Sequence, residues 1–125
     1  MHISIKATNL DLTEAIEEHA RKRAAMLEKN LPPGQADNAH LSVEVGKTTA
    51  HHKTGDVFRA EFNLVLDGKP WRAVSEKADL YSAIDEVKEE MLRIVRSQKD
   101  KKVSLLRRGG QRVKKIVRGL TGRGR

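Results

Sequence analysis

The sequence contains no cysteine, which excludes disulfides and thiolate chemistry and suits a reducing compartment. No apolar run approaches the roughly 18 residues of a membrane-spanning helix, and the N-terminal segment MHISIKATNL lacks the pattern of a secretion signal. A nucleophile elbow, a P-loop and a dinucleotide fingerprint are missing as well. We therefore expect a soluble, cytoplasmic protein that is not an enzyme and that uses no cofactor and no small-molecule substrate.

Charge is distributed unevenly along the 125 residues, which suffice for one small core. Residues 1–102 contain 17 Lys and Arg against 17 Asp and Glu, whereas residues 103–125 contain eight Lys and Arg and no acid. This predicts one domain over 1–102 and a basic, flexible tail over 103–125. A polyanion, either nucleic acid or acidic lipid, is the partner that such asymmetry favours, and a tail that serves only solubility is the alternative.

The clearest helical signal lies in residues 79–102. Apolar residues recur there at intervals of four and three, and Asp79 is a suitable N-cap. The exposed charges run from acidic to basic, so the helix should end positive. The apolar stripe consists of Leu80, Ile84, Val87, Met91 and Ile94, and the basic residues are Arg93, Arg96, Lys99, Lys101 and Lys102.

A second helix is predicted to begin at Asn9, Asp11 or Thr13 and to stop near Asn30, ahead of a Pro-Pro-Gly loop. Its charges follow the same order, from acidic to basic. The apolar stripe consists of Leu12, Ile16, Ala20, Ala24 and Leu27, and the basic residues are Arg21, Lys22, Arg23 and Lys29.

Alternating apolar residues predict strands over 2–6, 40–46 and 58–66, with a polar loop over 47–55. Asp67-Gly68 is a two-residue hairpin signal that places Phe62 opposite Ala73, Asn63 opposite Arg72 and Leu64 opposite Trp71. The large aromatic residues of this hairpin then lie on the inner face of the sheet. That position disfavours a sheet that stacks RNA bases on its surface.

The order β-α-β-β-β-α predicts an α+β two-layer sandwich, with a four-stranded sheet and two parallel helices on one face. Parallel helices bring both basic C-terminal ends to the same end of the domain. Gly109-Gly110 should break the chain before a basic amphipathic segment, 111–120, which could fold on RNA or lie on an anionic membrane. The Gly-Arg alternation that follows favours RNA.

Two segments resemble the hibernation-promoting factor and ribosome-associated translation inhibitor family: HHKTGDVFRAEFNL at 51–64 and DLYSAID at 79–85. The resemblance spans residues 1–102. It includes, on the helices, Ile16, His19, Arg23, Leu27, Glu28, Lys29, Arg93, Lys99, Asp100 and Lys101. It implies a fold similar in layering to double-stranded-RNA-binding domains and a site in the mRNA and tRNA channel of the small ribosomal subunit. Such a protein inhibits translation in stressed or resting cells.

By that analogy the rRNA contacts are Arg23, Lys29, Arg93, Lys99 and Lys101. The full set of expected RNA-binding residues is Arg23, Lys29, His51, His52, Lys53, Arg93, Arg96, Lys99, Lys101, Lys102, Arg107, Arg108, Arg112, Lys114, Lys115 and Arg118. Because His51 and His52 are adjacent and no third ligand has suitable spacing, we expect RNA contact there and no metal site. Glu90 departs from the lysine that several relatives carry.

The expected partners are the small subunit with its rRNA and the whole ribosome, and the protein is expected to be monomeric off the ribosome and without a membrane partner. The chain lacks the C-terminal domain of the long family members, so direct ribosome pairing is not expected. Two alternatives stay open. One is a general structured-RNA-binding or ribosome assembly factor, and the other is a peripheral membrane protein anchored by 111–120.

Overall fold

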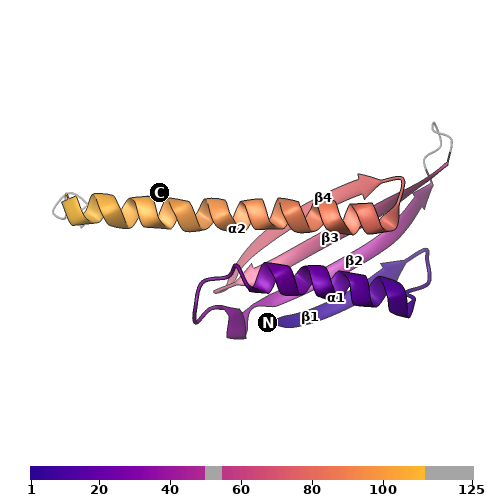
Figure 1. Ribbon diagram of the computed structural model, residues 1–125, viewed down its shortest axis with the longest axis horizontal. Helices are drawn as coiled ribbons and strands as arrows, with labels where there is room; N and C mark the ends of the chain where they lie inside the picture. Colours follow the sequence, from indigo (N-terminus) through magenta and orange to yellow (C-terminus); the bar gives the residue numbers. More distant parts are fainter. Residues whose placement is uncertain (50–54, 112–125) are drawn as a thin grey trace. The chain divides into compact units, whose positions relative to one another are not determined.

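The computed structural model describes residues 1–49 and 55–111, with side chains for 1–48 and 55–98. The elements in order are β1 (His2–Thr8), α1 (Glu14–Glu28), the short 3-10 helix η1 (Ala36–Asn38), β2 (His40–Thr49), β3 (Asp56–Leu66), β4 (Lys69–Lys77) and α2 (Leu80–Gln111) (Figure 1). The chain divides into two compact units, residues 1–95 and 96–125. The first contains the sheet, α1 and residues 80–95 of α2, and the described part of the second is helical.

The four strands form one mixed sheet in the order β1-β2-β3-β4, in which β1 and β2 are parallel and the other pairs antiparallel. Figure 1 shows α1 and residues 80–95 of α2 over the same face of the sheet, running in the same direction. The α+β prediction and the parallel orientation of the helices are confirmed. The topology requires this result, because a parallel strand pair needs a crossover and α1 supplies it.

The predicted hairpin is present at Asp67-Gly68, where both residues have positive φ, 56° and 79°. Two successive left-handed residues make the turn whose twist matches that of the flanking strands, which explains the Asp-Gly pair. Phe62 lies opposite Ala73, and Leu64 opposite Trp71, as predicted. Trp71 packs against the core.

The core lies between the inner face of the sheet and the two helices. Phe62 and Leu64 on β3 are fully buried, as are Leu27 on α1 and Ile84 and Val87 on α2. Ala20 and Ala24 are also fully buried, and their small side chains allow α1 to approach the sheet closely. The alternating apolar residues of the strands and the apolar residues spaced three and four apart in the helices therefore pack into a single core.

Both helix starts follow the predicted caps. Thr13 Oγ1 accepts a hydrogen bond from the Ile16 amide at 3.2 Å, and Asp79 Oδ2 accepts one from the Ser82 amide at 2.9 Å. Each cap satisfies one of the amide groups that a helix N-terminus leaves without an intrahelical partner.

The predicted end of the second strand at Gly46 is wrong, because β2 continues to Thr49. Gly46 lies inside the sheet opposite Thr8, whose carbonyl oxygen would be 3.3 Å from an added Cβ. The residues that follow are held against β3 by a hydrogen bond from Thr48 Oγ1 to the Val57 carbonyl and by an ion pair between Lys47 and Asp56. Glycine here marks close packing within the sheet, not a chain break.

The predicted helix end at Lys102 and the break at Gly109-Gly110 are also wrong, because α2 continues to Gln111. Glycine destabilises a helix by about 1 kcal/mol relative to alanine, yet it can adopt helical φ and ψ. The domain boundary at residue 102 stays a prediction.

Glu61 is an almost fully buried acid on the sheet face opposite the helices, only 8% exposed. Its carboxylate accepts hydrogen bonds from Arg72 Nε at 2.7 Å and Asn63 Nδ2 at 2.9 Å, and Arg59 Nη2 lies 2.9 Å away. Burial, the largest influence, raises the pKa of Glu61, but these hydrogen bonds and the charge of Arg59 lower that pKa on balance. The ionised carboxylate thus joins side chains of β3 and β4.

Replacing Glu61 with Gln is expected to lower the free energy of unfolding at neutral pH by about 1–3 kcal/mol, because two arginines lose a charged acceptor. A carboxyl whose pKa is lowered by folding stabilises the protein above its unfolded pKa and loses that contribution as pH falls through the folded pKa. The difference from the unsubstituted protein should therefore vanish in acid, as measured by urea unfolding. Glu76→Gln, on an exposed residue of the same sheet face, is the control. Equal effects of the two substitutions would contradict the role of Glu61.

Candidate nucleic-acid interface

The two helices of the first unit meet along a seam at the carboxylate of Asp85 on α2. Asp85 Oδ1 lies 2.6 Å from Arg23 Nε and 2.8 Å from His19 Nε2, both on α1. His19 and Arg23 are four residues apart and therefore share a helix face. The ring of Tyr81 packs edge-on against His19, with the ring centroids 4.9 Å apart. One carboxylate thus joins the two helices.

The charge of Asp85 is stabilised by these contacts. Burial, the largest influence, raises the pKa of Asp85, but the hydrogen bonds from Arg23 and His19, with their charges, lower that pKa on balance. The side chains of Arg23 and Asp85 are 31% and 47% exposed, so solvent reaches both partners. The pair is accessible to a competing anion.

Among the expected RNA-binding residues, Arg23, Lys29, Arg93 and Arg96 have described side chains. Lys29 caps the C-terminal end of α1 and is exposed, with no ion-pair partner among the described residues. Arg93 is exposed and pairs with Glu90 on the same helix. Arg96 is exposed and unpaired within the described part of the chain, and it belongs to the second unit.

The remaining expected residues have no described side chain. The backbone of Lys99, Lys101, Lys102, Arg107 and Arg108 is helical, as part of α2. The loop residues His51, His52 and Lys53 and the tail residues Arg112, Lys114, Lys115 and Arg118 lie outside the described residues. For these twelve residues RNA contact stays a prediction.

Asp85, His19, Arg23 and Tyr81 form what we call the Asp85 cluster. Lys29 and Arg93 lie on the same side of this cluster. Because the helices are parallel and rise about 1.5 Å per residue, Lys29 lies about 15 Å along α1 from His19, and Arg93 about 12 Å along α2 from Asp85. The first helix does not itself end in basic residues as predicted, since its last turn contains none. That turn ends at Glu28, which pairs with the N-terminal amine of Met1 at 3.1 Å.

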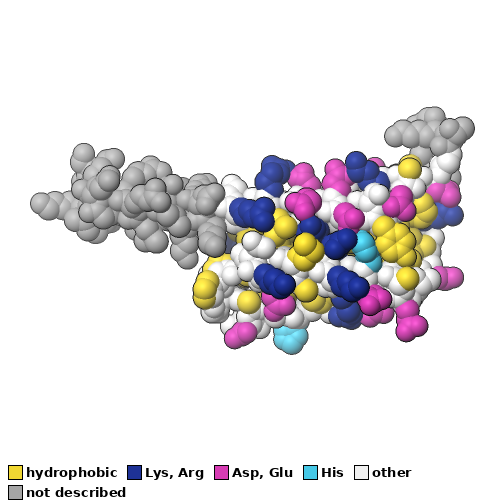
Figure 2. Space-filling model, in the orientation of Figure 1, with side chains coloured by type: hydrophobic (Ala, Val, Ile, Leu, Met, Phe, Trp, Pro, Cys, Tyr) yellow, Lys and Arg dark blue, Asp and Glu magenta, His cyan; other side chains and the backbone are white. Residues whose placement is uncertain are grey.

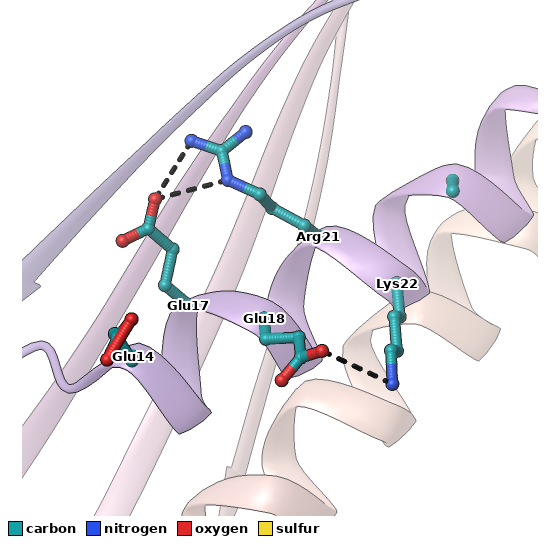
Figure 3. A pocket seen from close by; sticks show the side chains of 6 residues that line it. Glu14, Glu17, Glu18, Arg21 and Lys22 are labelled. Atoms are coloured by element: carbon teal, nitrogen blue, oxygen red, sulfur yellow. Dashed lines mark hydrogen bonds and ion pairs between the residues drawn. The ribbon is translucent and has the colours of Figure 1, made fainter.

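The helix face carries both signs of charge. Figure 2 shows Lys and Arg side chains spread over the two helices, with Asp and Glu side chains among them. A shallow open hollow on α1, with a volume of about 630 Å³, is lined by Glu14, Glu17, Glu18, Arg21, Lys22 and Ala25 (Figure 3). Its four central charges neutralise one another in the pairs Arg21–Glu17 and Lys22–Glu18. Because three glutamates line the hollow against one arginine and one lysine, its net charge is −1, which does not attract a phosphate.

The sequence interpretation missed two features of α2. The contacts of Asp85 were not predicted, because its partners lie 62 and 66 residues away in the chain. Lys88 is 7% exposed, and its ammonium pairs with Glu89. Its position four residues after Ile84, beside the apolar stripe, could have indicated this burial. His19 is largely buried, with 19% of its side chain exposed.

No group of three or more His, Asp or Glu residues in 1–49 and 55–111 could hold a metal ion. Over the same described ranges, no helix has both the length and the apolar composition needed to cross a bilayer.

Residues 3–103 match a family model described as sigma 54 modulation protein / S30EA ribosomal protein. Among solved structures, the N-terminal domain of Protein Y from Thermus thermophilus is 29% identical, with a TM-score of 0.57, and the match covers 76% of this chain and 96% of that one. A ribosomal subunit interface protein from Coxiella burnetii is 18% identical, with a TM-score of 0.63 and coverage of 80% and 99%. The second likeness supports the fold alone.

The link between the helices can be measured with a double-mutant cycle of Arg23→Ala and Asp85→Ala. We expect a coupling free energy of about 1 kcal/mol, since the partners are partly exposed and solvent screens their attraction. The cycle Arg21→Ala with Glu17→Ala, on the exposed face of α1, should give about 0.3 kcal/mol. Urea unfolding provides both values. No coupling between Arg23 and Asp85 would mean that the pair does not stabilise the helix packing.

Proposed function

The chain belongs to the sigma 54 modulation protein / S30EA ribosomal protein family, and from that premise we propose that it binds the small ribosomal subunit in the channel for mRNA and tRNA. By occupying this channel it inhibits translation under stress or in stationary phase, and it catalyses no reaction. The observation that carries the proposal is the family match over residues 3–103, found on a fold whose two parallel helices carry exposed cations.

The helix layer supplies contacts suited to rRNA phosphates. Lys29 is an exposed cation without an ion-pair partner among the described residues, and Arg93 is 74% exposed beside Glu90. Arg23 can reach solvent from the seam. Each cation that neutralises a phosphate releases counterions from the RNA, and this release supplies much of the binding free energy. Because Lys29 and Arg93 lie at similar heights along parallel helices, one RNA surface can contact both.

Residues 103–125, which we propose as a basic tail, add eight Lys and Arg without a single acid. A segment of this composition attracts RNA at long range and contributes affinity without sequence preference. The whole ribosome is then a partner as well as the free small subunit, which implies a cytoplasmic location. We propose that the protein is monomeric when it is not bound to a ribosome.

Co-sedimentation with purified ribosomal subunits tests the function. The protein should pellet with small subunits and whole ribosomes and not with large subunits, and prior loading of mRNA and initiator tRNA should strongly reduce the bound fraction. Equal binding to loaded and empty small subunits would refute occlusion of the channel. Competition by bulk double-stranded RNA at equal affinity would instead support a general structured-RNA-binding protein.

The contribution of the helix layer can be read from the salt dependence of binding. In the double variant Lys29→Ala and Arg93→Ala, the slope of log affinity against log salt should fall by about 1.4–1.8, because each lost phosphate contact removes about 0.7–0.9. The matched control is Lys6→Ala, since Lys6 is exposed on β1, on the sheet face away from the helices. It should leave the slope unchanged. If Lys6→Ala lowered the slope as much per removed charge, the position of a cation on the protein would not matter for binding.

A further inference from the structure

The Asp85 cluster contains two donors for one carboxylate oxygen. Arg23 Nε and His19 Nε2 both lie within hydrogen-bonding distance of Asp85 Oδ1, at 2.6 Å and 2.8 Å. Within the described residues, neither donor pairs with another carboxylate. Arg23 is also an expected RNA contact. Asp85 therefore holds a cation that the proposed RNA ligand would also attract.

We propose that protonation of His19 allows Arg23 to leave Asp85 for an rRNA phosphate, so that binding to the small subunit takes up a proton. This inference rests on the proposed function and describes how that same interface is regulated. Asp85 and His19 are positioning residues in this scheme, whereas Arg23 contacts the RNA.

The charges of the cluster give the reason. With a neutral imidazole, Arg23 and Asp85 cancel, and a phosphate must compete with a carboxylate already bound to the guanidinium. Protonation of His19 adds one positive charge, so that its hydrogen bond to the ionised Asp85 carboxylate becomes an ion pair in which donor and acceptor are both charged. The imidazolium can then retain Asp85 alone, and the guanidinium is available to the phosphate.

The Asp85 cluster contains a single histidine, His19. On α2, Tyr81 packs edge-on against the imidazole, and Lys88, three residues beyond Asp85, is paired with Glu89. On α1, the charged neighbour of His19 in the cluster is Arg23. Of these side-chain types, histidine alone ordinarily changes charge between about pH 5 and pH 8. The side chains of His19 and Asp85 are 19% and 47% exposed, so protons have access to the cluster.

The sign of the pH dependence follows from the linkage between proton binding and binding to the small subunit. If the complex binds more protons than the free partners, affinity rises as pH falls, by at most about tenfold per pH unit for one proton. The chain contains four other histidines, so total pH dependence is not diagnostic. The diagnostic quantity is the part of it that depends on His19.

The test measures affinity for purified small ribosomal subunits between about pH 8 and pH 6 at constant ionic strength. The unsubstituted protein should gain about three- to tenfold more affinity over this range than His19→Gln, which cannot be protonated. Calorimetry of the same binding in two buffers of different ionisation enthalpy should show fewer protons taken up by His19→Gln. The control is His40→Gln, since His40 is exposed on β2. It should behave like the unsubstituted protein.

Asp85→Asn separates this scheme from a purely structural role. Without the carboxylate, Arg23 is available at every pH, so this variant should bind at about pH 8 at least as tightly as the unsubstituted protein and should show the weak pH dependence of His19→Gln. A protein in which Asp85 only supported the fold would lose affinity at every pH, and that result would overturn the proposal. An unchanged pH dependence of binding in His19→Gln would overturn the proposal too. This second test holds even if Asp85→Asn does not fold. Failure of the unsubstituted protein to bind small subunits at any pH would instead refute the proposed function on which the inference rests.

Discussion

The parallel pairing of β1 with β2 is the constraint on which the arrangement of the interface depends. Parallel neighbours need a crossover, and α1 makes it by returning along the sheet. Two antiparallel steps, β2 to β3 and β3 to β4, then leave the chain at the end where α1 began, so α2 starts beside it. One strand more or fewer would reverse α2. Lys29 and Arg93 would then lie at opposite ends of the helix layer.

The acids on the helices compete with a polyanion for the arginines, and this competition shapes the interface. Arg23 pairs with Asp85 and Arg93 with Glu90. Exposed pairs of this kind stabilise a protein by about 1 kcal/mol or less, so a phosphate can replace the carboxylate at small cost. Until then the carboxylate restricts the rotamers of the guanidinium, which reduces the entropy lost on binding. Such pairs therefore compete with the phosphate and at the same time preorganise the guanidinium for it.

Local signals in the sequence predicted most of the fold, because strand alternation, the Asp67-Gly68 turn and the caps at Thr13 and Asp79 each depend on near neighbours. The prediction failed where distant contacts decide. Gly46 stays in the sheet because two strands flank it, and nothing in residues 79–85 shows that Asp85 binds Arg23. For the candidate site, the exposure of Lys29 and Arg93 was predictable from helical periodicity. The pairing of Arg23 and His19 with Asp85 was not, because these side chains are more than 60 residues apart in the chain.

The equal numbers of acids and bases in residues 1–102 limit how this protein can recognise RNA. A charge-balanced body produces little field beyond a Debye length, about 8 Å at physiological salt, so its cations act only on phosphates that already lie close. The unbalanced charge of residues 103–125 acts at longer range and accelerates encounter. On the proposed function, the two parts therefore have separate tasks. The tail raises the rate of association, while the helix layer fixes the orientation in which the domain sits on the RNA, because phosphate contacts set position.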